Sequence, residues 1–278
     1  MLVDLTISRW TAVKHDRAVS AEVDQTHAAK QGGRYNKYLI DKAHLAAIDS
    51  ITNELRKYHY SRTLPWTDKG HRILPADLFF DYQQELAKYR QQFQTAVSDF
   101  VKLYPQLVQD ARLRLGTMYR PEDYPQPSDL FGMFGISLDI APVPDANDFR
   151  VDVAQETQDE IRAQITQAVA TRQTKMVKEC WARMREVVGR IAEQCGKENG
   201  VIRDSLMDNA RDLVAVLGGL NVTNDPEIAA VENDIRDKLL VPTTRLRVSP
   251  GARVQTAQIA RELLERMLIS EEEHADWL

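Results

Sequence analysis

The sequence predicts a mainly helical α+β fold with a small antiparallel sheet, a long central helix and no OB-type barrel. Apolar residues recur at three- and four-residue spacing over most of the chain, whereas the alternation typical of strands is confined to short segments. Of the 278 residues, 43% are hydrophobic and 28% charged, as in an ordinary globular protein. No apolar run reaches the roughly 18 residues of a membrane helix, so we expect no membrane segment.

The strand signal is limited to three segments, at 2–8, 134–140 and 149–153, which we expect to form one sheet. Residues 59–75 contain two prolines and a glycine and are predicted to form a loop. Glycine pairs at 32–33 and 218–219 and the proline at 105 are expected to end helices. The predicted helices other than the longest one span 12–30, 41–58, 76–103, a shorter piece that ends near Gly116, 201–217, 226–240 and 250–269. Asp225 and Ser249 are expected to cap the last two.

The longest predicted helix runs from 153 to 195. Its apolar stripe, from Ile161 to Cys195, repeats about every 3.8 residues and therefore does not form the 3.5-residue seam of a coiled coil. At about 1.5 Å per residue it would span roughly 60 Å, more than a compact domain, so we expect self-association. Cys180 and Cys195 would lie about 22 Å apart on this helix, too far for a disulfide. With only two cysteines and no secretory signal at the start, the sequence favours a reducing cytoplasm.

Charge is divided unevenly along the chain. The overall net charge is −5, but residues 1–120 carry +5 and residues 121–278 carry −10. We therefore predict a basic region at 1–120 that binds nucleic acid. We expect a Pro-rich β segment and a helical oligomerisation region at 121–269, followed by an acidic tail at 270–278.

Signatures of enzyme chemistry are missing from the sequence. The glycines at 32–33 are not followed by the Lys-Ser/Thr pair of a phosphate-binding loop. The six histidines and two cysteines show no metal-ligand spacing, and both cysteines fit the apolar stripe. We expect neither an enzyme, nor a metal, nor a cofactor.

Two tracts, at 30–38 and 56–72, mix cations with aromatic rings. Cations follow the phosphates of a nucleic acid, and exposed rings stack on unpaired bases, whereas duplex DNA keeps its bases stacked internally. The glycine pair at 32–33 is also expected to let the backbone approach a phosphate. The alternative is a solvated structural surface, with Trp66 as a buried plug. The candidate binding residues are Lys30, Arg34, Tyr35, Lys37, Tyr38, Arg56, Lys57, Tyr58, Tyr60, Arg62, Trp66, Lys69 and Arg72. A third basic tract, 112–120, is a weaker candidate.

The acidic end of the chain carries an apolar tip. A peptide of this kind can dock on a basic partner surface or compete with DNA, although it can also be a solubilising helix end. The residues predicted to contact a protein partner are Glu271, Glu272, Glu273, Asp276, Trp277 and Leu278.

The segments Val3–Trp10 and Thr63–Pro75 resemble a phage and bacterial family. It includes the single-stranded DNA-binding RNA polymerase cofactor of podoviruses with a virion-packaged polymerase. The resemblance covers chiefly residues 1–80. It implies a viral protein that coats single-stranded DNA as an oligomer in the host cytoplasm and helps a phage RNA polymerase, with a fold unlike the OB barrel. The alternative hypothesis is a helical adaptor that partners an AAA ATPase without binding DNA.

Overall fold

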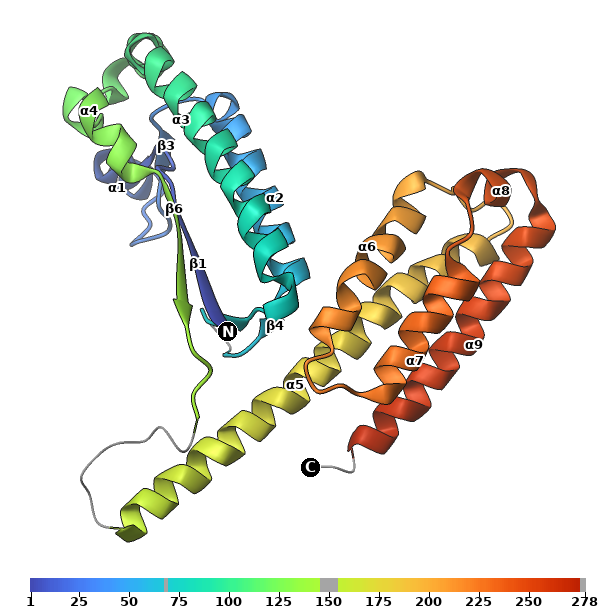
Figure 1. Ribbon diagram of the computed structural model, residues 1–278. Helices are drawn as coiled ribbons and strands as arrows, with labels where there is room; N and C mark the ends of the chain where they lie inside the picture. Colours follow the sequence, from blue (N-terminus) through green and yellow to red (C-terminus); the bar gives the residue numbers. More distant parts are fainter. Residues whose placement is uncertain (68–69, 146–154, 276–278) are drawn as a thin grey trace. The chain divides into compact units, whose positions relative to one another are not determined.

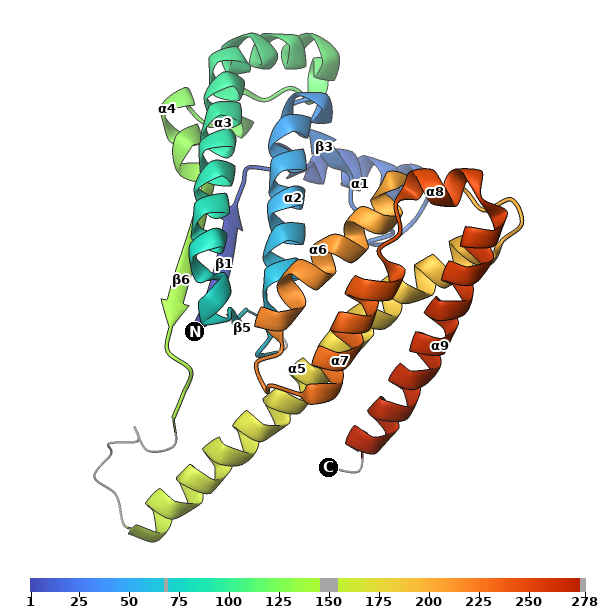
Figure 2. The same ribbon diagram turned by 45° about the vertical axis from the view of Figure 1, so that its right-hand side comes forward.

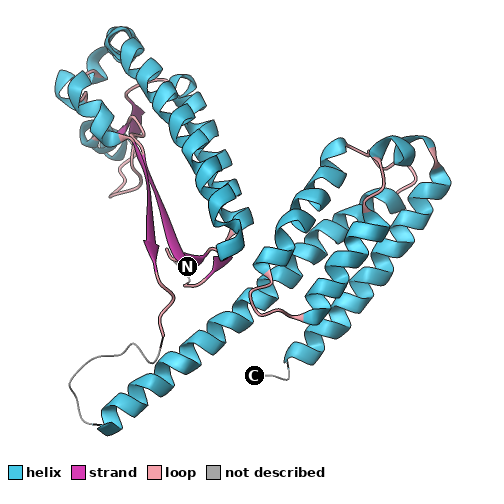
Figure 3. Cartoon of the chain, viewed as in Figure 1, coloured by secondary structure: helices cyan, strands magenta, loops and turns pink. Residues whose placement is uncertain are grey.

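A computed structural model describes residues 1–67, 70–145 and 155–275, with residues 155–157 and 270–275 described by their backbone alone. The described chain is mostly helical and contains two small open sheets, which confirms the predicted fold class (Figures 1 and 3). It divides into two compact units. We call Leu5–His59 with Gln83–Asp139 the ribbon unit. Met1–Asp4, Tyr60–Tyr82 and Ile140–Leu278 form the bundle unit. These units do not follow the predicted division at residue 120.

The ribbon unit is built on two long helices, α2 (Ala46–Arg62) and α3 (Phe79–Leu115), whose ends continue into the bundle unit. Its core is rich in aromatic rings, with Phe93, Phe100, Tyr104 and Phe134 buried together. A short helix, α1 (Arg17–Thr26), buries none of its side chains. The remaining helical turns are η1 (Lys42–Leu45), η3 (Gly116–Met118), η4 (Pro121–Asp123), α4 (Pro127–Leu130) and η5 (Phe131–Met133).

Two sheets are present in the described residues. One has the order β4 (Leu64–Pro65), β5 (Arg72–Ile73), β1 (Leu2–Ser8), β6 (Gly135–Ala141), and β1 and β6 run in opposite directions (Figure 2). The other pairs β2 (Val13–His15) with β3 (Asn36–Tyr38) in antiparallel register. The strands at 2–8 and 134–140 are thus confirmed, and the strand predicted at 149–153 lies outside the described residues. Sequence reasoning missed the four short strands.

The bundle unit packs helices around the C-terminal half of α5 (Gln155–Gly196), which makes its largest contact with α9 (Pro250–Ala275). Trp181, Met184 and Val188 of α5 are fully buried in this core. The first half of α5 extends past the ends of the other helices (Figures 1 and 2), and the described side chains before Met176 are at most half-buried. The other elements are η2 (Ala76–Leu78), α6 (Asp204–Leu220), α7 (Pro226–Asp234), the π-helical turn η7 (Ile235–Leu239) and α8 (Thr243–Val248).

The long helix is confirmed to within two residues at each end, but two expected helix ends are wrong. α3 continues through Pro105 and changes direction along its length (Figure 2). Burial of Tyr104 and Leu107 on either side of this exposed proline outweighs a cost of about 3 kcal/mol. α6 likewise continues through Gly218 and Gly219. A Cβ at Gly219 would lie 3.0 Å from Leu78 Cγ, so this glycine allows close packing and does not end the helix.

Capping residues place several helix starts. Asp225 accepts hydrogen bonds from the amides of Glu227 (2.8 Å) and Ile228 (3.4 Å), and Ser249 accepts one from Ala252, as the sequence predicts. α1 begins later than predicted because Asp16 caps it and residues 13–15 pair with β3. Among the described helices, none combines the length and the hydropathy that crossing a membrane requires.

Candidate nucleic-acid interface

Three tyrosines present their rings to solvent. The exposed fractions of Tyr35, Tyr38 and Tyr60 are 40%, 42% and 53%. The other six of the chain's nine tyrosines are half-buried or buried. All three exposed tyrosines belong to the two tracts predicted to bind nucleic acid. Among the tyrosines, these three rings are therefore the ones that are available to stack on a base.

In the ribbon unit, Tyr38 lies on the outer face of the two-stranded sheet. The register pairs Val13 with Tyr38 and His15 with Asn36, and because side chains alternate across a strand these four share one face. The Nζ atom of Lys42 lies 4.4 Å from the centre of the Tyr38 ring. An ammonium over an aromatic face is attracted to the ring quadrupole and also supplies a charge for a phosphate.

The loop before β3 exposes Lys30, Arg34 and Tyr35. Internal hydrogen bonds hold it in place: the amides of Gln31 and Gly32 each donate to the Asp24 carboxylate at 3.1 Å. The Tyr35 amide donates to the hydroxyl of Ser20 at 3.0 Å. The expectation that the glycine pair brings its backbone to a phosphate therefore fails at Gly32, because Asp24 already accepts that N–H. The loop contributes side chains to the interface.

Lys37 does not belong to this interface, because the alternation that exposes Tyr38 turns Lys37 inward. Its side chain is 2% exposed, and its Nζ lies 3.0 Å from Asp16 Oδ2 and 2.7 Å from Asp123 Oδ2. The same ammonium donates to the Met118 carbonyl at 2.9 Å. Lys14 Nζ lies 2.6 Å from the other oxygen of Asp123. The three donors of Lys37 are thus all used, and the residue joins β3, α1 and η4.

The buried ion pairs of Lys37 predict acid sensitivity of the ribbon unit. The hydrogen bond from Lys37 and that from the Val19 amide lower the pKa of Asp16. At Asp123, burial raises the pKa, but the hydrogen bonds from Lys14 and Lys37 outweigh it and the pKa is lowered. A carboxyl whose folded-state pKa is lowered stabilises the fold above the ordinary aspartate value, and this stability is lost as the pH falls below about 4. Hydrogen exchange of residues 13–38 between pH 6 and 3 should show this loss. Asp123→Asn should flatten the pH dependence, and an unchanged slope would contradict this assignment.

In the bundle unit, Tyr60 and Arg72 come together at the C-terminal end of α2. The Arg72 guanidinium lies 4.6 Å from the Tyr60 ring centre and donates to Thr63 Oγ1 at 2.7 Å. Arg183 of α5 donates to the carbonyl oxygens of Tyr60 and Thr63, both at 2.8 Å. It thereby supplies a hydrogen-bond donor to carbonyl groups at the C-terminal end of α2, which lack a partner within the helix. Burial and the nearby charge of Arg183 lower the pKa of Arg72.

Unlike the exposed Tyr60, Trp66 is buried. It directly follows β4, and its side chain lies on the inward side of the β4–β5 pair. It is 5% exposed and belongs to the same core as Leu64, as the structural alternative for this residue expects. The Arg172 guanidinium lies 5.0 Å from its ring centre. Both residues line a groove whose other walls are Thr67, Gln164, Gln167, Ala168, Thr171 and Lys175. The described part of its lining contains two cations and no carboxylate, and so suits an anion.

No family model, curated protein or solved structure matches the chain. Function must therefore be argued from the residues of these surfaces. Sequence reasoning missed Lys42, Arg172, Lys175 and Arg183. Arg172 and Lys175 lie on an amphipathic helix about one hundred residues after Trp66, and no local pattern in the sequence marks them as neighbours of that ring.

The remaining candidates either lie on α2 or fall outside the rings and cations already described. Tyr58 is half-buried against Tyr89, with ring centres 5.9 Å apart, and Lys57 pairs with Glu54 at 2.8 Å. Arg56 and Arg62 are half-buried. Lys69 lies outside the described residues. The backbone of Glu271, Glu272 and Glu273 continues α9, and Asp276, Trp277 and Leu278 lie outside the described residues.

The described residues offer little for covalent or metal chemistry. They contain no group of three or more His, Cys, Asp or Glu side chains that could hold a metal ion. Burial raises the pKa of the Cys180 thiol to about 12 and also raises that of Cys195. Both thiols therefore stay protonated at neutral pH and are poor nucleophiles.

Proposed function

We propose that this protein binds single-stranded DNA with little sequence preference. The observation that carries the proposal is that the three exposed tyrosines all lie in tracts where the sequence predicts stacking on bases. A cation lies over the rings of Tyr38 and Tyr60, and Tyr35 follows the exposed Arg34 in the chain. Rings of this kind accept any base, and the neighbouring cations contribute affinity by releasing counterions from the phosphates. The two units carry net charges of +2 (ribbon) and −7 (bundle), so local cations, and not the net charge, attract the strand.

We further propose that the protein acts as an oligomer in phage transcription or replication, in the cytoplasm of an infected cell. The resemblance of residues 3–10 and 63–75 to the viral polymerase cofactors supports a role in recruiting a phage RNA polymerase. The first half of α5 extends past its own bundle and offers a surface for a second copy. The same feature favours the second candidate function, a helical adaptor that holds an AAA ATPase without binding DNA.

A salt series distinguishes these two functions. Wild-type protein should shift a single-stranded oligonucleotide at least tenfold more strongly than the matched duplex. If about five cations contact phosphates, the logarithm of the affinity should fall with the logarithm of the salt concentration with a slope of about −3.5. Scrambling the oligonucleotide sequence serves as the control and should change the affinity little. No shift at 50 mM salt would reject DNA binding and leave the adaptor. Equal affinity for strand and duplex would reject the preference for single strands.

A further inference from the structure

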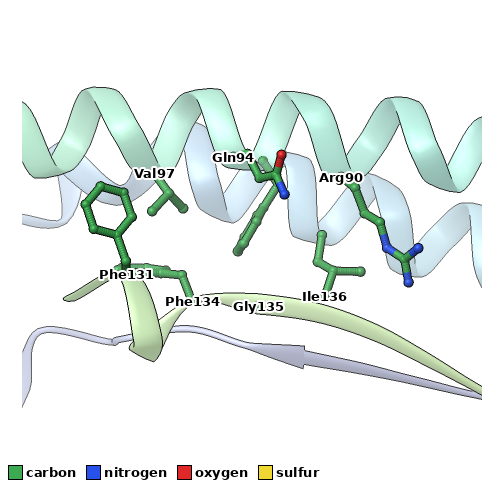
Figure 4. Close-up of a pocket in the computed structure, with 8 residues that line it drawn as sticks. Arg90, Gln94, Val97, Phe131, Phe134, Gly135 and Ile136 are labelled. Carbon is green, nitrogen blue, oxygen red and sulfur yellow. The ribbon is translucent and has the colours of Figure 1, made fainter. Parts of the chain in front are cut away.

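The ribbon unit contains a pocket that is separate from the exposed tyrosines. It has a volume of about 380 Å³ and lies between α3 and the start of β6 (Figure 4). Phe93, Val97, Phe134 and Ile136 form much of an apolar lining, and Phe131 is 53% exposed. Arg90 and Phe131 lie toward opposite ends of the pocket, and Gln94 lies between them (Figure 4).

Arg90 indicates that the pocket takes an anion. Its Nε–H is buried and has no hydrogen-bond acceptor among the described residues. A buried donor without a partner is costly, so an acceptor at this end of the pocket would be bound favourably. Among the described residues that line the pocket there is no carboxylate, and Arg90 is the one charged side chain. A guanidinium in this setting suits a phosphate, which it can contact with two N–H groups.

The rest of the lining defines the body of the ligand. Arg90, Gln94 and Val97 lie on one face of α3 over seven residues, which corresponds to about 10 Å along the helix. This length admits a phosphate and one flat ring system. The aromatic side chains of Phe131 and Phe134 are suited to contact a ring, and the Gln94 amide offers both a donor and an acceptor at mid-pocket. A base has a polar edge that can hydrogen-bond to this amide, which an alkyl chain cannot do.

We propose that this pocket binds a single nucleotide, with an unpaired base against Phe131 and its phosphate on Arg90. As a site on a bound strand, this inference rests on the proposed function, but the pocket can be tested with the nucleotide alone. A base held here would anchor the strand on the ribbon unit, in addition to stacking on Tyr35 and Tyr38.

The test uses the full chain and the fluorescence anisotropy of 2-aminopurine deoxyribonucleoside monophosphate. The probe should bind wild-type protein, and the same nucleoside without its phosphate should bind about tenfold more weakly. Phe131→Ala and Arg90→Gln should each weaken binding of the monophosphate about tenfold. Phe80→Ala removes an 81% exposed ring and Lys102→Gln removes a 72% exposed α3 cation; neither residue lines the pocket, and both variants should bind as wild type.

Each outcome separates the pocket from the proposed function. No anisotropy change with wild-type protein, or equal affinities for wild type and Phe131→Ala, would overturn the pocket assignment, even if a long oligonucleotide still binds. Binding of decanoate at this site without binding of the nucleotide would overturn it too, in favour of an aliphatic acid. Nucleotide binding that depends on Phe131 and Arg90, without affinity for a long strand, would support the pocket and reject the proposed function.

Discussion

Replacing Lys37 with methionine is expected to destabilise the ribbon unit by about 3 kcal/mol. Methionine keeps much of the apolar stem of lysine but removes the ammonium that contacts Asp16, Asp123 and the Met118 carbonyl. The side chains of the two aspartates are 6% and 4% exposed, so water cannot replace the lost charge easily. Asp16 also caps α1, so its loss of a partner should loosen the start of that helix.

Hydrogen exchange of residues 13–38 measures this loss, with residues 180–220 of the bundle unit as an internal reference. Lys57→Met is the matched control. It removes the same charge from a side chain that is 73% exposed, where an ion pair contributes at most about 1 kcal/mol. If Lys37→Met and Lys57→Met exchange alike, the buried network is not a stabilising element. A lower DNA affinity of a fully folded Lys37→Met protein would return Lys37 to the binding residues.

The elements that the sequence predicts best are those whose pattern is long and local. The long helix is found because its apolar stripe persists over ten turns, and the caps at Asp225 and Ser249 are local chemistry. Pro105 and Gly219 wrongly predict helix ends, because tertiary packing outweighs the local preference of proline and glycine for ending a helix. The side chains that pack around them are known only from the fold. The compact units are likewise discontinuous in sequence, so a division by local charge could not find them.

The candidate site was predictable in its residue types but not in its geometry. Cations and rings at 30–38 and 56–72 mark the tracts, and three exposed tyrosines lie in them. Lys37 and Trp66 have the same composition signal, but Lys37 is turned inward by the alternation along β3, and Trp66, directly after β4, is part of the core. Strands of two or three residues carry too little pattern to be recognised, so the direction of these two side chains could not be derived. Arg172 and Arg183 come from α5 and are adjacent to the second tract only in the fold.

Replacing Tyr35, Tyr38 and Tyr60 together with alanine is expected to weaken binding of a long single strand at least a hundredfold at low salt. Stacking on an aromatic side chain contributes about 1–3 kcal/mol per base, so even the lower value for three rings gives about 3 kcal/mol. Each tenfold change in affinity corresponds to about 1.4 kcal/mol. The rings are 40–53% exposed, so the variant should keep its fold. The salt dependence should persist, because the cations remain.

The matched control replaces the same three tyrosines with phenylalanine, which keeps the rings and removes the hydroxyl groups. If the rings act by stacking, the phenylalanine variant should bind within about threefold of wild type, whereas loss of hydroxyl hydrogen bonds would weaken both variants alike. Circular dichroism of each variant checks that the helices are intact. An alanine variant that binds as tightly as wild type would show that no base lies on these tyrosines. The cations and the pocket at Phe131 would then have to account for the affinity, and the pocket alone for any preference for single strands over duplex.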